Sequence, residues 1–221
     1  MEQKPLAYYK EVFNVSDIDD AKKIILTSEG PGAETAVRWE KETPYVVQQI
    51  ISMLGISQDM LILDYGCGIG RISKEIIKEL KCHIIGVDIS PDMRRLAVDY
   101  VESDRFISVS PEVFDALVMA GLRVDAAFSV WVLQHCEEPV KDILRIQKSL
   151  KKDGGFYVLN MERRAVPVIS EDRKFFHWDF DGVNIREEVI KRFALVDEGH
   201  PDLNAIPNPA DAGAFWMNLR N

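Results

Sequence analysis

The sequence has few cysteines, no long apolar run and no excess of positive charge. Its three cysteines, Cys67, Cys82 and Cys136, form no CxxC pair, so we expect neither a disulfide scaffold nor a metal site, and the composition favours a reducing, cytoplasmic location. No stretch of about 18 uncharged apolar residues occurs, which predicts no membrane span. The 36 acidic residues outnumber the 27 basic ones, for a net charge of −9. That balance disfavours nucleic acid as a partner.

Short apolar runs alternate with amphipathic ones through the middle of the chain. The runs that predict strands are 60–66, 83–89, 105–110, 125–133 and 155–161. The segments between them repeat apolar residues at helical spacing. Strands that alternate with helices predict an α/β fold with a Rossmann-like, doubly wound sheet. Further along, we expect a helix over 182–193 and strands over 194–199 and 213–220.

The first 58 residues predict a helical segment ahead of the sheet. Ser16 and Asp19 form a candidate capping box for a helix that ends at Gly30, and Pro44 is placed to begin a second helix. We expect residues 1–58 to form an N-terminal helical segment or lid, and residues 59–221 to form the Rossmann-like domain. Such a lid would lie over the carboxyl ends of the strands, where open α/β sheets bind ligands.

The stretch "LDYGCGIGR" (63–71) follows the first predicted strand. Its three glycines do not fit the dinucleotide pattern G-x-G-x-x-G, because Arg71 stands where the third glycine belongs, and the G-K-[ST] ending of a phosphate loop is also missing. Asp64 precedes the glycines, and Asp88 ends the second strand, where an acid can bind the hydroxyls of a ribose. A carboxylate beside the loop would repel a pyrophosphate but suits a cation. S-adenosylmethionine, which carries an ammonium and a sulfonium, is the predicted cofactor.

Three stretches, "LDYGCGIGR", "VDISPDM" and "SVWVLQHC", resemble class I S-adenosylmethionine-dependent methyltransferases, and "LKKDGGFYVLNM" resembles their fifth-strand segment. The resemblance implies a seven-stranded sheet whose last strand, here 213–220, runs antiparallel. The cofactor-binding residues that it implies are Asp64, Gly66, Cys67, Gly68, Gly70, Asp88, Ile89 and Met93. Many members carry an acid after strand three that binds the adenine amino group. This chain offers Ser108, Ser110 or Glu112 there, and we take Ser110 as the candidate.

Four residues are candidates for the acceptor side, beside a possible catalytic histidine. His135 follows the fourth strand and could act as a base or orient the acceptor, although it could equally bond the turn before Pro139. Arg163, His177 and Trp178 follow the fifth strand and combine cationic with aromatic groups, as small-molecule pockets do. A solvated loop would look similar. Trp39 could close the pocket from the N-terminal helices or could be a core residue.

The segment "SVWV" stands where base-modifying members of this family carry an N/D-P-P-Y/F motif. Methylation of nucleic-acid amines is therefore disfavoured. We predict transfer of a methyl group to an O, N or C atom of a small molecule by in-line displacement, which needs positioning more than covalent help from the protein. Two alternatives are a non-catalytic S-adenosylmethionine-binding protein and a nicotinamide-dependent oxidoreductase.

Overall fold

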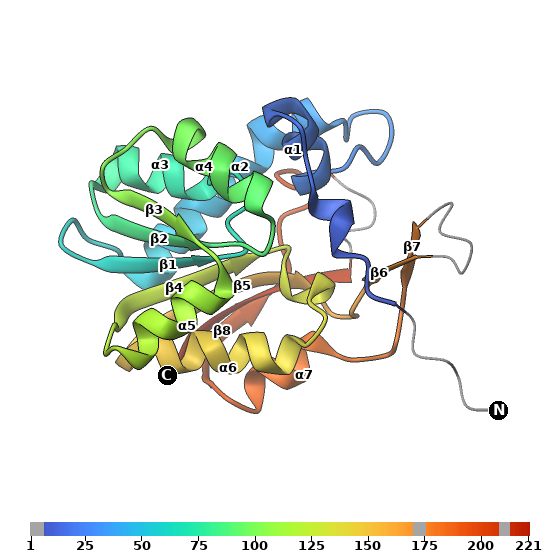
Figure 1. Ribbon diagram of the computed structural model, residues 1–221. Helices are drawn as coiled ribbons and strands as arrows, with labels where there is room; N and C mark the ends of the chain where they lie inside the picture. The colour runs from blue at the N-terminus through green and yellow to red at the C-terminus, as the bar shows by residue number, and fades with distance from the viewer. Residues whose placement is uncertain (1–6, 170–175, 208–212) are drawn as a thin grey trace.

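The computed structural model describes residues 7–169, 176–207 and 213–221, and its centre is a sheet of seven strands (Figure 1). In spatial order the strands are β3 (Phe106–Val109), β2 (His83–Val87), β1 (Leu61–Tyr65), β4 (Val124–Val130), β5 (Leu150–Met161), β9 (Ala214–Arg220) and β8 (Ala194–Gly199). The pairs from β3 to β5 are parallel, whereas β9 runs antiparallel to both β5 and β8. The predicted Rossmann-like sheet with an antiparallel last strand is confirmed.

Helices cover both faces of the sheet (Figure 1). One face carries α2 (Thr35–Leu54), α3 (Arg71–Leu80) and α4 (Pro91–Val101), and the other carries α5 (Pro111–Met119), α6 (Pro139–Ser149) and α7 (Ile185–Ile190). The starts of α4 and α5 follow directly from the sequence. Ser90 and Ser110 each accept a hydrogen bond from a backbone N–H in the first turn, and a proline follows each of them.

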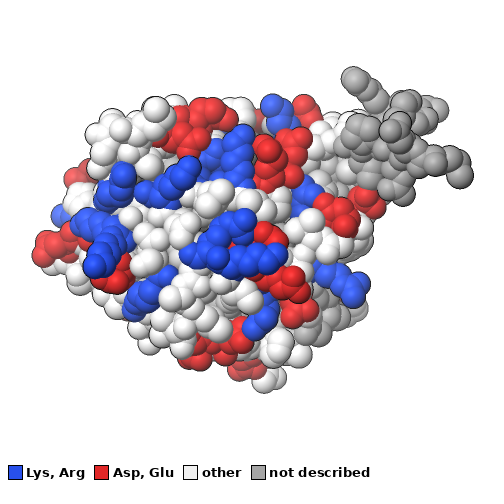
Figure 2. Space-filling model, turned by 90° about the horizontal axis from the view of Figure 1, so that it is seen from below, with Lys and Arg blue, Asp and Glu red and all other residues white. Residues whose placement is uncertain are grey.

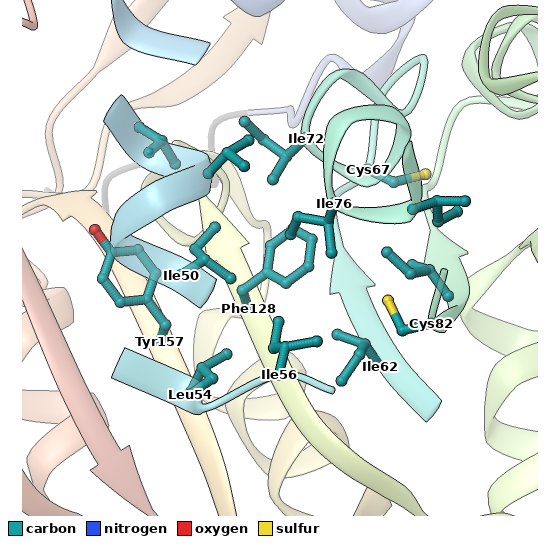
Figure 3. Close-up of a cluster of buried hydrophobic side chains, with 14 of the residues drawn as sticks. Ile50, Leu54, Ile56, Ile62, Cys67, Ile72, Ile76, Cys82, Phe128 and Tyr157 are labelled. Carbon is teal, nitrogen blue, oxygen red and sulfur yellow. The ribbon is translucent and has the colours of Figure 1, made fainter. Parts of the chain in front are cut away.

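The alternation of side chains along the strands builds a hydrophobic core on each face of the sheet. On β1, Ile62 joins the cluster under α2 and α3, while Leu63 joins the cluster under α5 and α6. Figure 3 shows the first cluster, in which Ile50 of α2 and Ile76 of α3 pack beside Phe128 of β4. Because α2 shares this core with the sheet, its position is fixed by packing on the strands that carry the site.

The N-terminal helices differ from the prediction. Asp17, not Ser16, caps α1 (Ile18–Ile25) by accepting from the N–H groups of Asp19 and Asp20, and α1 ends before Gly30. Pro44 lies inside α2 instead of at its start. A proline in a helix interior removes one hydrogen bond. The buried side chains of α2 lie on both sides of Pro44, and we attribute the continuity of the helix to that packing.

A small two-stranded sheet, which the sequence did not predict, lies beside the main sheet (Figure 1). Its strands are β6 (Val166–Ile169) and β7 (Phe176–Asp179), which pair antiparallel; the intervening 170–175, part of the loop expected after strand five, lie outside the described residues. An N-terminal segment adds to this hairpin, because Tyr8 bridges to Val168 and the Tyr9 N–H donates to the Pro167 carbonyl at 2.9 Å. A short 3-10 helix, η1 (Lys10–Phe13), follows. We call residues 8–13 together with β6 and β7 the cap.

Figure 2 shows the molecule from below the view of Figure 1, which is the side of α6 and α7. On this face, basic and acidic side chains are intermixed. Several basic groups of the α6 and α7 layer are paired, Arg145 with Asp115 and Asp142, and Arg192 with Glu188. Within the described part of the chain, no helix is both long enough and apolar enough to cross a membrane.

Candidate active site

The glycine loop joins β1 to α3 and needs glycine for two separate reasons. Gly66, Gly68 and Gly70 have φ angles of 81°, 53° and 77°, in the left-handed region that favours glycine. A Cβ at Gly66 would overlap the side chain of Val132, and one at Gly68 would lie 2.8 Å from Ile25 Cδ1. Gly66 and Gly68 line the main cavity of the protein, whereas Gly70 packs on the side chain of Val101 instead.

Asp88 follows β2 and faces both the glycine loop and the cavity. Its Oδ2 accepts from the Gly68 N–H and its Oδ1 from the Ser90 N–H, both at 2.9 Å. Burial raises the pKa of Asp88, and these backbone hydrogen bonds oppose that shift. Each carboxylate oxygen has a further lone pair. The group is therefore held in place by the loop and can still accept hydrogen bonds from two neighbouring hydroxyls.

Asp64 lies beneath the loop and does not line the cavity. Its side chain is buried, and Oδ2 accepts from Ser73 Oγ at 2.6 Å. Burial raises the pKa of Asp64 to about 7, while the Ser73 hydrogen bond works against this rise. The side chain that the resemblance places beside the cofactor thus joins β1 to α3 through Ser73.

The other predicted cofactor residues divide into two groups. Ile89 and Met93 line the cavity. Cys67 and Ser110 do not: the Cys67 thiol is buried 3.7 Å from Ser108 Oγ, with its pKa raised by burial, and Ser110 caps α5. At the end of strand three it is Glu112, beside Pro111, that lines the cavity. Ser110 is thus a helix cap, and the acid is the group that faces the cavity.

His135 lies in η2 (Leu133–His135), just after β4, and lines the cavity. Its Nδ1 donates to the Ala165 carbonyl at 2.8 Å, and its Nε2 accepts from the Gln134 side-chain amide at 3.1 Å. Burial lowers the pKa of His135 to about 4, and the bond to Ala165 opposes that shift. At neutral pH the ring is uncharged, and both of its nitrogens are bonded within the protein. This arrangement suits a role in positioning the cap more than a role as a general base.

The predicted acceptor residues are only partly brought together. Arg163 and Trp178 line the cavity, and the Trp178 ring lies 4.6 Å from the His135 ring. His177 is exposed and does not line the cavity, because neighbouring residues of a strand point to opposite sides. Trp39 also lies away from it, packed edge-on to Tyr100 with the Arg71 guanidinium 5.5 Å from its ring centroid.

Several cavity residues were missed by the sequence interpretation. Tyr65 donates to Asp142 at 2.5 Å and accepts from Arg145 at 2.7 Å, and all three line one wall. Burial raises the pKa of the Tyr65 hydroxyl, so it stays protonated. The spacing of Asp142 and Arg145, three apart on a helix, was a usable signal. Another was the alternation of aromatic residues at 176, 178 and 180, which is typical of a strand.

The cavity has a volume of about 850 Å³ and runs from the glycine loop to the cap. At one end it offers side-chain-free backbone, the carboxylate of Asp88 and the apolar side chains of Ile89 and Met93. These groups fit an adenosine whose ribose hydroxyls reach Asp88 and whose other end carries positive charge. A carboxylate held against the loop fits a pyrophosphate poorly.

Comparisons with known proteins agree with this geometry. A family model described as a methyltransferase domain matches residues 56–197. Phosphoethanolamine N-methyltransferase 2 of Caenorhabditis elegans is 32% identical over 95 residues, which are 42% of this chain and 22% of that protein. The uncharacterized methyltransferase C70.08c of Schizosaccharomyces pombe (strain 972 / ATCC 24843) is 22% identical over 117 residues, 51% of this chain and 44% of that protein. This chain therefore spans less than half the length of either relative.

One solved structure with a similar fold contains a bound ligand. The N-methyltransferase NodS from Bradyrhizobium japonicum WM9, in complex with S-adenosylhomocysteine, superposes with a TM-score of 0.57 at 12% identity, over 80% of this chain and 86% of that one. At that identity the likeness concerns the fold alone. The family model covers well over half of the sequence. The chain belongs to the class I methyltransferases that use S-adenosylmethionine as cofactor.

Proposed function

We propose that this methyltransferase transfers the methyl group to an O, N or C atom of a small-molecule acceptor. The observation that carries the proposal is a continuous cavity of about 850 Å³ that has the glycine loop and Asp88 at one end and the cap at the other. This volume lies within the range of small-molecule pockets. The cap covers the far end with side chains from residues 8–13 and from β7, which favours a compact acceptor over a polymer.

The residues that would hold the cofactor are those of the glycine-loop end. In our proposal the backbone of Gly66 and Gly68 lies against the amino-acid end, Asp88 accepts from the ribose hydroxyls, and Ile89, Met93 and Glu112 surround the adenine. S-adenosylmethionine supplies a methyl group bound to a positively charged sulfur. When the methyl group is transferred, this sulfur leaves as a neutral thioether, which makes it an excellent leaving group. Asp64 supports this end from beneath the loop through its bond to Ser73.

The chain's own task is then to position the acceptor and exclude water. His135 contributes by fastening the cap: its ring donates to Ala165 just before β6, and its backbone carbonyl accepts from the Tyr8 hydroxyl at 3.2 Å. The ring itself is a poor base at neutral pH. An acceptor that reacts as a neutral amine or as a preformed anion needs no base from the protein.

The test is a screen of small acceptors with S-adenosylmethionine, in which formation of S-adenosylhomocysteine is measured. We expect turnover with a subset of the acceptors and none without an acceptor. Asp88→Ala serves as the control, because it should lower turnover through weaker cofactor binding. Cofactor binding without turnover on any acceptor would favour the non-catalytic alternative. Stabilisation by NAD instead of S-adenosylmethionine would favour the oxidoreductase.

Two further points belong to the proposal. We place the enzyme in the cytoplasm, because the described structure holds Cys67 and Cys82 as buried free thiols and such thiols suit a reducing compartment.

We also propose a boundary near residue 58 between the helical segment and the Rossmann-like domain. The beginning of the family match at residue 56 supports that boundary.

A further inference from the structure

Four aromatic rings from three distant segments form a continuous wall at the acceptor end of the cavity. We name them the aromatic wall: Phe13, His135, Trp178 and Phe176. Consecutive ring centroids lie 6.4, 4.6 and 6.1 Å apart. All four side chains line the cavity. We propose that the acceptor is a flat aromatic molecule, uncharged or anionic, that packs against this wall; the inference rests on the proposed function.

The strand β7 presents its aromatic side chains to the cavity by alternation. Phe176 and Trp178 point into it, Phe180 follows on the same side, and His177 points away. The exposed fractions of Phe176, Trp178 and Phe180 are 43%, 38% and 65%. Large apolar side chains gathered in a cavity and left this exposed are typical of a ligand surface. A flat ligand would cover them, and aromatic pairs at such distances add to the gain from buried area.

His135 contributes an uncharged ring to the wall. Its two nitrogens are bonded to Ala165 and Gln134, so its hydrogen-bonding edge faces the protein and not an acceptor. The Gln134 side chain is itself buried and fixed, because its Oε1 accepts from the Met161 N–H at 2.8 Å. The wall therefore offers the acceptor aromatic surface and few hydrogen-bonding partners, which selects for a ring system over a sugar or an amino acid.

The charges around the aromatic wall argue against a cationic acceptor. The charged lining residues of the segments that carry or adjoin the wall are Lys10, Glu137, Glu138, Lys141, Glu162 and Arg163, three of each sign and all exposed. They give no net negative charge, and the methyl donor adds a positive charge at the inner end of the cavity. A cation would therefore meet repulsion that these exposed carboxylates do not offset. An anionic substituent can instead pair with Arg163 or Lys10.

The experiment measures binding of three probes by calorimetry to the full chain saturated with sinefungin, an analogue of S-adenosylmethionine that carries an ammonium group in place of the methylated sulfonium. The probes are 2-naphthoate, its saturated analogue decahydro-2-naphthoate, and 2-naphthylmethylammonium. We expect naphthoate to bind at least about tenfold more tightly than the saturated acid, and the ammonium to bind most weakly. Equal binding of the two acids, tightest binding of the ammonium, or no binding of any probe would overturn the inference.

Variants of β7 locate the binding. Trp178→Leu should lower naphthoate affinity about tenfold and abolish the preference over the saturated acid, whereas Trp178→Tyr should keep the preference. His177→Leu is the matched control on the opposite side of the same strand and should change affinity less than twofold. Unchanged naphthoate affinity in Trp178→Leu would refute the inference. Unchanged affinity of each variant for S-adenosylhomocysteine shows that the fold is intact. Failure of the parent chain to bind S-adenosylhomocysteine would instead count against the proposed function.

Discussion

The cofactor end and the acceptor end of the cavity are built in opposite ways. The cofactor end comes from β1, the glycine loop and the turn after β2, which are close in sequence. Backbone N–H groups of the loop hold it in place, since those of Gly66 and Cys67 donate to the Val87 carbonyl and that of Gly68 donates to Asp88 Oδ2. The acceptor end combines residues 8–13, η2 and β7, which meet only through long-range contacts. The first end exposes loop backbone beside the side chains of Asp88, Ile89 and Met93, while the second is made of side chains. In our proposal, the cofactor end would determine the chemistry and the acceptor end would determine the substrate.

The largest expected effect is the loss of stability caused by a substitution at Gly66, in the glycine loop of the cofactor end. Gly66→Ala adds a Cβ that overlaps Val132 at a left-handed φ of 81°, so we expect a loss of about 4 kcal/mol in the free energy of unfolding. Gly32→Ala is a matched control, because Gly32 has a φ of 82° and nothing within 4 Å of its Cβ position. Chemical denaturation of both variants measures the difference. An equal loss of unfolding free energy in Gly66→Ala and Gly32→Ala would show that the contact with Val132 does not contribute to the effect.

The second effect concerns the carboxyl beneath the same loop. Burial raises the pKa of Asp64 to about 7, so the folded state binds more protons than the unfolded state between about pH 4 and pH 7. The free energy of unfolding should therefore fall as pH rises through that window, by about 3 kcal/mol from this group. Asp64→Asn, compared with the parent chain by urea denaturation at several pH values, should flatten the curve. The same slope in both proteins would contradict the assignment.

The third effect tests the ribose contact. Asp88→Ala removes a carboxylate that is placed to accept from two hydroxyls, and we expect the affinity for S-adenosylhomocysteine to fall by about 2 kcal/mol. Calorimetry measures the change. Asp92→Ala, which changes a partly exposed acid in the first turn of the adjoining helix α4, is the control. Full affinity in Asp88→Ala would remove this residue from the cofactor site.

The smallest expected effect is that of a substitution at His135, at the acceptor end of the cavity, whereas the other three changes lie at the cofactor end. His135→Phe keeps a ring but loses the hydrogen bonds to Ala165 and Gln134, so we expect about 1 kcal/mol lower stability and unchanged affinity for S-adenosylhomocysteine. Once an acceptor is known, turnover should fall several-fold without a change in its pH profile. A lost ionisation near neutral pH would instead identify His135 as a base.

The sequence predicted the local structure around the glycine loop, because its signals are local. Of the residues expected at the cofactor, Asp64, Cys67, Gly70 and Ser110 do not line the cavity. A tight strand-to-helix turn needs glycine, and Ser90 with Pro91 marks a helix start, whatever the rest of the chain does. It predicted the acceptor end poorly. Trp178 and Arg163 were chosen by residue type alone, while Tyr8 and Phe13 reach the cavity only through tertiary contacts that no short pattern encodes. Pro44 was misread for a similar reason, since packing against the core outweighs its usual preference for a helix start.

The pairing of Tyr8 with Val168 joins residues 160 positions apart and fastens the cap with few backbone bonds. The hairpin of β6 and β7 is a single strand pair, and the side chains of Phe176, His177 and Trp178 on β7 are exposed, so its backbone bonds open at low cost. Amide hydrogens of β6 and β7 should therefore exchange with deuterated solvent long before those of β1 and β4. In our proposal, the acceptor would enter through this sub-global opening, while the cofactor would remain beside the slowly exchanging strands of the main sheet.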